Sequence, residues 1–177
     1  MTYFLLIRKI SPYTAPNILL GAFDSERAAQ DARNLYFDRY RPTDRTPTTN
    51  VWLAQIFPWL RLQPDTNPNG DPWHEQGYKT DGLTEDDLVI QTFDVECDPT
   101  FNEISVVSRY YDVMGQISRE IDSVHLNPLM AEQRMKEIET IAENATATDY
   151  MPPNLFDTQT IRINEIQSDA PEQQSFR

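Results

Sequence analysis

The stretch TYFLLIRKI, residues 2–10, decides how the fold begins. Tyr3, Leu5 and Ile7 alternate with Phe4 and Leu6, so apolar side chains would point to both faces of a strand. A strand that is apolar on both faces is typical of one covered on both sides. We therefore expect residues 2–10 to form a buried strand.

The next segments extend this strand into a small unit. ILLGAF (18–23) predicts a second strand, DSERAAQDARNLYFDRY (24–40) a helix, and NVWLAQIF (50–57) a third strand. Asp24 or Ser25 is the expected N-cap of the helix. The expected buried face of this helix consists of Ala28, Ala29, Ala32, Leu35 and Tyr36.

After one further strand, the chain repeats the same order of elements from Glu103 onward. LVIQTFDVEC (88–97) reads as a strand, and EISVVSRYYD (103–112) turns through VMG into QISREID (116–122). A helix follows with Asn127 as N-cap and Pro128 at its first position, and TQTIRINEI (158–166) closes as a strand. The expected buried stripe of this helix is Ala131, Met135, Ile138, Ala142 and Ala145.

These patterns predict an α+β fold of mixed, mostly antiparallel sheets with two main helices. We divide the chain into an N-terminal ββαβ unit (1–62), a Pro/Gly-rich connector (63–87), an acidic C-terminal β(ββαβ) unit (88–166) and a polar tail (167–177). The strand–strand–helix–strand order occurs twice without residue-level identity. A duplicated ββαβ unit is therefore a hypothesis.

Composition limits the class of protein. Hydrophobic residues make up 39% of the 177 residues, which is enough for a packed core. Cys97 is the single cysteine, so no intrachain disulfide can form. The N-terminus lacks the features of a signal peptide, and no apolar run approaches the ~18 residues of a membrane span. We expect a soluble, cytoplasmic protein.

Charge is unevenly distributed along the chain. The net charge is −13, with 28 acidic against 15 basic residues. Residues 1–62 carry 8 Lys/Arg and 5 Asp/Glu, whereas residues 63–177 carry 7 and 23. Such an acidic part repels nucleic-acid backbones, so direct binding to nucleic acid is not expected through it. The acidic charge then either serves solubility alone or attracts a partner protein with a basic surface.

Three acidic residues, Asp94, Glu96 and Asp98, alternate along the strand that begins at residue 88. In a strand they would share one face, while Phe93, Val95 and Cys97 point to the core. Carboxylates that share a face repel one another unless they are solvated, paired with bases or bridged by a divalent cation. We favour a solvated face, paired with Arg109 or Arg119 across the sheet.

FDVECD (93–98) resembles the first metal motif of the 3′–5′ exonuclease domain of B-family DNA polymerases. The resemblance implies that Asp94 and Glu96 bind two Mg²⁺ ions that activate water. NLFD (154–157) stands in for the second motif, with Asp157 as its ligand. The third motif, Tyr-x-x-x-Asp, has no counterpart, because no Tyr follows Asp157. A metal-dependent nuclease is therefore an alternative hypothesis.

Other sets of residues give little support to catalysis. His74 and His125 are the only histidines and have no partner at zinc spacing. The chain has neither a nucleophile elbow nor a phosphate-binding Gly loop.

Arginines and aromatic residues of the N-terminal unit would suit the binding of single-stranded nucleic acid. We favour the hypothesis that these arginines pair with acidic residues of the C-terminal part, within the chain or between copies. The set is Arg27, Arg33, Arg39, Arg41 and Arg45, among Tyr36, Phe37, Tyr40 and Trp52.

The sequence thus predicts a non-enzymatic, acidic interaction module: an adaptor, an assembly subunit or an inhibitor that imitates nucleic acid. Its partner would be a protein with a basic surface, and homo-oligomers are compatible with this function. We expect no catalytic residues, no cofactor and no metal. The predicted partner-binding surface consists of Asp94, Glu96, Asp98, Glu137, Glu139 and Glu143.

Overall fold

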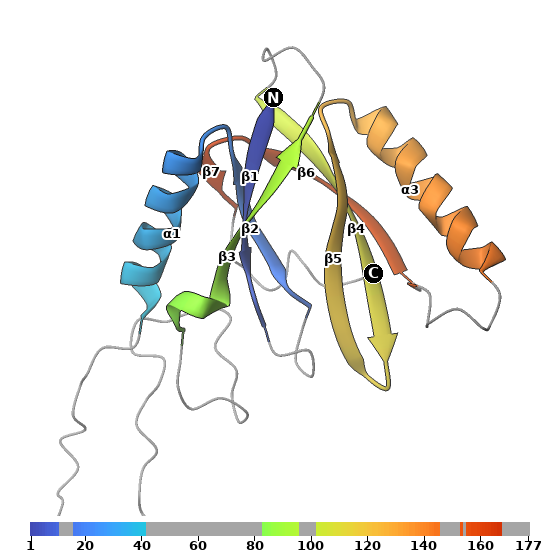
Figure 1. Cartoon of the computed structure of the whole chain (residues 1–177), viewed down its shortest axis with the longest axis horizontal. Coiled ribbons are helices and arrows are strands. Elements are labelled where there is room, and N and C mark those ends of the chain that lie inside the picture. The colour runs from blue at the N-terminus through green and yellow to red at the C-terminus, as the bar shows by residue number, and fades with distance from the viewer. Residues whose placement is uncertain (11–15, 42–82, 96–101, 146–152, 154, 168–177) are drawn as a thin grey trace, which may run out of the picture.

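The computed structural model describes residues 1–10, 16–41, 83–95, 102–145, 153 and 155–167 (Figure 1). The predicted strand at 50–57, most of the connector and nearly all of the tail lie outside these residues. Within them the chain forms two α-helices and two mostly antiparallel sheets, so the predicted α+β class is confirmed. None of the described helices is long and apolar enough to cross a membrane.

The first sheet has the strand order β3-β1-β2-β7. β1 is Thr2–Arg8, β2 is Ile18–Phe23, β3 is Leu88–Asp94 and β7 is Glu165–Ile166. The paired strands are antiparallel, and all six residues of β2 are buried. The two strands predicted at the start of the chain are therefore confirmed.

The second sheet has the strand order β5-β4-β6, again antiparallel. β4 (Glu103–Val113) and β5 (Gln116–His125) form a hairpin. Both residues of its turn, Met114 and Gly115, have positive φ, which suits the twist of a two-residue hairpin. β6 is Leu155–Arg162. The single strand predicted at 158–166 is thus two strands, β6 and β7, that belong to different sheets.

Among the described residues, the run β1, β2, α1, β3 and the run β4, β5, α3, β6 order their strands alike. In each run the first strand lies between the other two, and the first sheet adds β7 beside β2. β3, which we had grouped with the C-terminal unit, pairs along its whole length with β1. The two runs therefore share one topology, while their origin by duplication stays a prediction.

The elements stack as four layers, with one helix outside each sheet (Figure 1). α1 (Glu26–Tyr40) packs on the outer face of the first sheet, and α3 (Pro128–Asn144) on the outer face of the second. The inner faces of the sheets enclose the main core. This core consists of Tyr3, Leu5, Ile7, Leu19, Ala22, Ile104, Val106, Val124 and Ile161.

Both helices begin where the sequence predicts. Ser25 accepts a hydrogen bond from the Ala28 N–H, and Asn127 accepts one from the Leu129 N–H. Pro128 occupies the first turn of α3, where its missing N–H costs nothing.

The predicted buried faces of the helices are only partly correct. On α1 the buried residues are Ala29, Tyr36 and Tyr40, whereas Leu35 is 67% exposed. Positions 29, 36 and 40 lie along one line of the helix, and Leu35 is rotated about 100° from Tyr36. The prediction for Leu35 is therefore wrong. On α3, Ala131 and Ile138 are buried as predicted.

Candidate functional site

Asp94, the first residue of the acidic ladder, lies exposed at the end of β3. The Thr2 hydroxyl donates to its carboxylate at 2.7 Å, in register with the pairing of β3 and β1. Phe93 and Val95 pack against the core between the sheets, as their alternation predicts. Residues 96–98, with Glu96 and Asp98, lie outside the described part of the chain.

The structure does not join Asp94 and Asp157 in a metal site. Asp94 lies opposite Thr2 in the first sheet, while Asp157 lies opposite Ser108 in the second. Among the described residues, no three His, Cys, Asp or Glu side chains are grouped so that they could hold a metal ion. The nuclease hypothesis therefore gains no support from the described residues.

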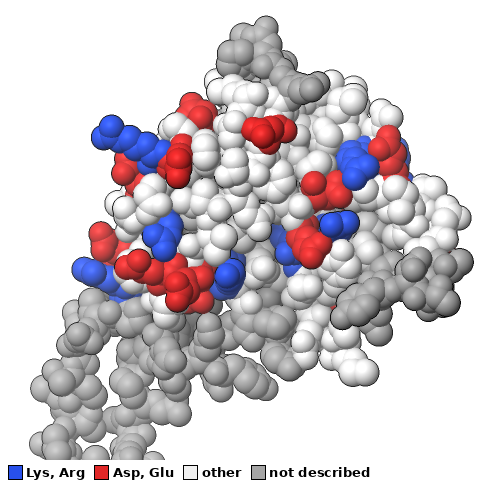
Figure 2. All heavy atoms as spheres, in the orientation of Figure 1, with Lys and Arg blue, Asp and Glu red and all other residues white. Residues whose placement is uncertain are grey.

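The three helical residues of the predicted partner-binding surface lie on a different layer from Asp94. Glu137, Glu139 and Glu143 are exposed on α3, outside the second sheet. Glu137 is already paired with Arg134, at 3.6 Å. Figure 2 shows acidic and basic side chains interspersed over the face in view, rather than one acidic patch. This face does not favour an inhibitor that imitates nucleic acid.

For Asp94, the described residue of the ladder, the predicted pairing with Arg109 or Arg119 across the sheet is wrong. Both arginines belong to the second sheet, whereas β3 belongs to the first. Arg109 forms an ion pair with Glu120 at 3.2 Å, and Arg119 is buried and donates to the Ser108 hydroxyl at 2.9 Å. The sequence could not reveal this, because strand pairing joins residues that are far apart in the chain.

The three predicted arginines of α1 are not all exposed: Arg27 and Arg39 are exposed, whereas Arg33 is half-buried. Arg33 donates to the backbone oxygens of Leu88 and Glu85, at 3.0 and 2.9 Å, and so joins α1 to β3. Tyr36 and Tyr40 are buried in the core beneath the helix. Neither ring is available to a nucleobase, so the described residues do not favour the single-stranded nucleic-acid binder.

Only one of the described arginine pairs matches the predicted link with the acidic part of the chain. Arg33 Nη2 lies 3.8 Å from the Glu85 carboxylate. Arg27 pairs with Asp31, and Arg41 pairs with Asp38, both close in sequence. Arg45 lies outside the described residues.

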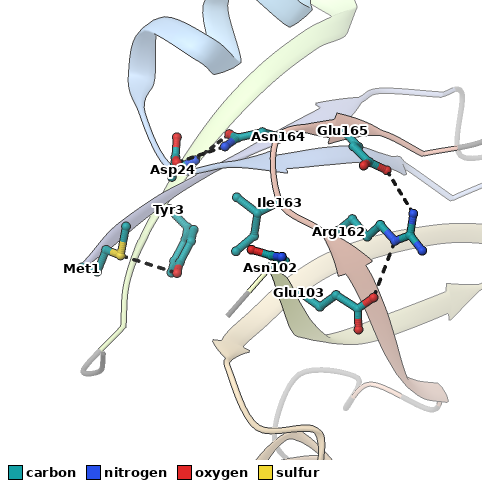
Figure 3. Close-up of a pocket in the computed structure, with 9 residues that line it drawn as sticks. All are labelled: Met1, Tyr3, Asp24, Asn102, Glu103, Arg162, Ile163, Asn164 and Glu165. Atoms are coloured by element: carbon teal, nitrogen blue, oxygen red, sulfur yellow. Dashed lines mark hydrogen bonds and ion pairs between the residues drawn. The ribbon is translucent and has the colours of Figure 1, made fainter. Parts of the chain in front are cut away.

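A cavity of about 650 Å³ opens where the two sheets meet (Figure 3). Its walls come from the start of β1, the β2–α1 turn, the start of β4 and the segment that joins β6 to β7. Residues far apart in the sequence thus share one site. We call it the junction cavity.

Asn164 fixes one wall of the junction cavity. Its φ of 63° is a left-handed conformation that asparagine tolerates better than most residues. Its side-chain oxygen accepts from the Asp24 N–H at 3.2 Å, and its amide nitrogen donates to the Asp24 carboxylate at 3.0 Å. Its own N–H donates to the Ala22 oxygen at 2.7 Å. These bonds hold the segment between β6 and β7 against the first sheet.

The charged lining of the junction cavity is mainly acidic. Arg162 lies between two carboxylates, with Nε 3.6 Å from Glu103 and Nη1 3.8 Å from Glu165 (Figure 3). Asp24 adds a third carboxylate. The contacts of Arg162 are longer than the 2.7–2.9 Å typical of a charge-assisted hydrogen bond. The side chains of Arg162, Glu103 and Glu165 are each more than half exposed, so these ion pairs are weak.

The apolar part of the lining lies deeper in the junction cavity. Tyr3 is 1% exposed, and its hydroxyl donates to the Met1 sulfur at 3.6 Å. Ile163 packs against the core between the sheets. The site thus combines an apolar wall with an acidic rim. Our sequence reasoning missed it, and the one local signal was Asn164, an asparagine suited to positive φ.

No protein-family model, no curated protein and no solved structure matches this chain. The function therefore rests on the chemistry of the site.

Proposed function

We propose that this protein is a non-enzymatic interaction module that binds a basic segment of a partner protein. In this proposal the junction cavity receives one arginine or lysine side chain of that segment. The observation that carries it is the lining: the Glu103 and Glu165 carboxylates flank the Arg162 guanidinium, and the Asp24 carboxylate, bonded to Asn164, lines the same cavity.

The weak ion pairs of Arg162 support this proposal. An incoming guanidinium can form two parallel hydrogen bonds with a carboxylate, which Arg162 does not do with Glu103 or Glu165. The partner's cation would then replace one long contact with a shorter one. Its aliphatic stem would lie along Ile163, as long basic side chains do on apolar surfaces.

Size and charge agree with this assignment. The cavity, at about 650 Å³, has room for one arginine or lysine side chain. The net charge of −13 attracts a basic partner from a distance and raises the association rate at low salt.

The test is a binding titration with a fluorescently labelled peptide in which arginine alternates with glycine. The matched control peptide replaces each arginine by citrulline, which keeps the shape and removes the charge. We expect the arginine peptide to bind and the affinity to fall as salt rises.

The matched protein variants are Glu103→Gln combined with Glu165→Gln, against Glu139→Gln combined with Glu143→Gln on α3. Both doubles change the net charge equally. We expect at least a tenfold loss of affinity in the first and little change in the second. Equal losses in both doubles, or equal binding of the citrulline peptide, would contradict the proposal.

A further inference from the structure

Arg119 is a buried cation in the layer between the two sheets. It lies on β5, and only 8% of it is exposed. Its Nε donates to the Ser108 hydroxyl at 2.9 Å, and its Nη2 donates to the Gln159 side-chain oxygen at 3.2 Å. The guanidinium also lies over the Tyr110 ring, 5.7 Å from its centroid. Each of these partners is neutral.

Arg119 has no ion pair with a carboxylate among the described residues. Two of its five N–H groups are used by Ser108 and Gln159. A buried guanidinium loses the hydration of its charge, and burial accordingly lowers the pKa of Arg119, against the raising influence of Tyr110 and the exposed Asp157. An anion beside it would recover part of this lost stabilisation.

A small cavity of about 20 Å³ lies beside this guanidinium, between the sheets. The second sheet lines it with Arg119 and Ile121. The first sheet, together with Asn17 just before β2, lines it with Ile7, Leu19 and Gln91. This is room for about one water molecule or one monatomic ion. It is separate from the junction cavity.

The polar groups left over at this small cavity are mainly donors. The Asn17 side-chain oxygen already accepts from the Ile10 N–H at 3.1 Å, so its amide nitrogen is the end that remains. The terminal N–H groups of Arg119 that have no acceptor are also donors. Gln91, an exposed residue, supplies a further amide with both donors and one acceptor. A water molecule donates two hydrogen bonds as well as accepting them, and the side chains here offer only one acceptor for its two hydrogens. An anion only accepts, so it can bind to every one of these donors.

We infer that Arg119 and Asn17 form a buried site for one small monovalent anion, with chloride as the fitting ion. The anion would neutralise the Arg119 guanidinium of the second sheet and accept a hydrogen bond from the Asn17 amide, which lies beside the first sheet. It therefore joins the two layers. This site goes beyond the proposed binding of a basic partner and does not depend on it.

The test compares melting temperatures in sodium chloride and in sodium gluconate at equal ionic strength. Gluconate is too large for the cavity, so only chloride stabilises the folded state by binding there. We expect a saturable rise with chloride in the wild type and in Arg27→Gln, and its loss in Arg119→Gln. Arg27 is the matched control because its side chain is 92% exposed and its replacement changes the charge equally.

An equal response to both salts in the wild type would overturn the inference and leave the cavity to water. A chloride response that persists in Arg119→Gln would overturn it too. A second measurement covers failure of Arg119→Gln to fold: anomalous diffraction from wild-type crystals soaked in bromide. A peak beside Arg119 supports the site, and its absence there overturns it.

Discussion

Replacing Asp122 by asparagine is expected to weaken the packing of α3 on the second sheet. Asp122 lies on β5 with its side chain 7% exposed. Arg134 of α3 donates to both oxygens of this carboxylate, from Nε at 2.9 Å and from Nη2 at 3.3 Å. Arg109 Nη1 lies 3.9 Å from the same carboxylate. The carboxylate therefore joins the helix to the sheet beneath it.

The size of the effect follows from the two hydrogen bonds. A bond to a charged group contributes roughly 1.5–3 kcal/mol when it is well shielded. The Arg134 side chain is 37% exposed, so solvent reduces this value. Asparagine keeps one acceptor and loses the charge. We expect the free energy of unfolding to fall by about 2 kcal/mol and the melting temperature by about 4–8 °C.

The effect should depend on pH. Burial alone would raise the pKa of the Asp122 carboxyl, but the hydrogen bonds and charge of Arg134, with help from Ser123 and Arg109, outweigh it and lower the pKa. Protons then bind the unfolded chain more readily than the folded one. The stabilisation is present above the unfolded pKa of about 3.9 and is lost as the pH falls through the folded pKa. The gap between wild type and Asp122→Asn should narrow below about pH 4.

The matched control is Asp31→Asn on α1. Asp31 pairs with Arg27 at 3.9 Å, and the two side chains are 73% and 92% exposed. Such a pair contributes under about 0.5 kcal/mol. Urea denaturation followed by circular dichroism at pH 7 and pH 3 measures both variants. Equal midpoints for Asp122→Asn and Asp31→Asn at pH 7 would refute the reasoning.

Further outcomes can be measured by the same denaturation assay. Asn164→Ala should lose about 1–2 kcal/mol, because alanine tolerates positive φ poorly and lacks the two side-chain bonds. Gly21→Ala should lose about 1–3 kcal/mol, since an added Cβ would lie 2.7 Å from a backbone oxygen of β7. Leu35→Ala should change stability by less than about 0.5 kcal/mol, and Tyr36→Ala should cost about 3–5 kcal/mol. A fragment of residues 1–95 should lack a cooperative transition in calorimetry, because the core between the sheets needs both of them. A stable, cooperative fragment would contradict this reasoning.

The parts of the fold that depend on local chemistry could be predicted from the sequence. Ser25 and Asn127 cap their helices because a short polar side chain can reach the free N–H groups of a first turn. The alternation along residues 2–8 identified β1, whose inner face packs on the other sheet and whose outer face packs on α1. Periodicity alone carries this information.

The parts that depend on long-range pairing could not be predicted. β3 follows the connector in sequence, yet it pairs with β1, and no local pattern specifies that partner. The predicted neighbours of Asp94 across the sheet are therefore wrong. Arg119 shares one face of β5 with Ile117 and Ile121, and this face is turned toward the first sheet. Its burial follows from the packing of the two sheets, which the pattern of its own strand does not specify.

The return of the chain from β6 to β7 explains why the junction cavity exists. β6 completes the second sheet, and three residues later β7 pairs with β2 in the first. Arg162 and Glu165 stand on either side of this crossing, opposite Glu103 at the start of β4. A ligand held between these carboxylates would contact both sheets at once. Because unfolding separates the sheets, such a ligand binds only the folded chain, and its binding free energy adds to the stability of the whole molecule.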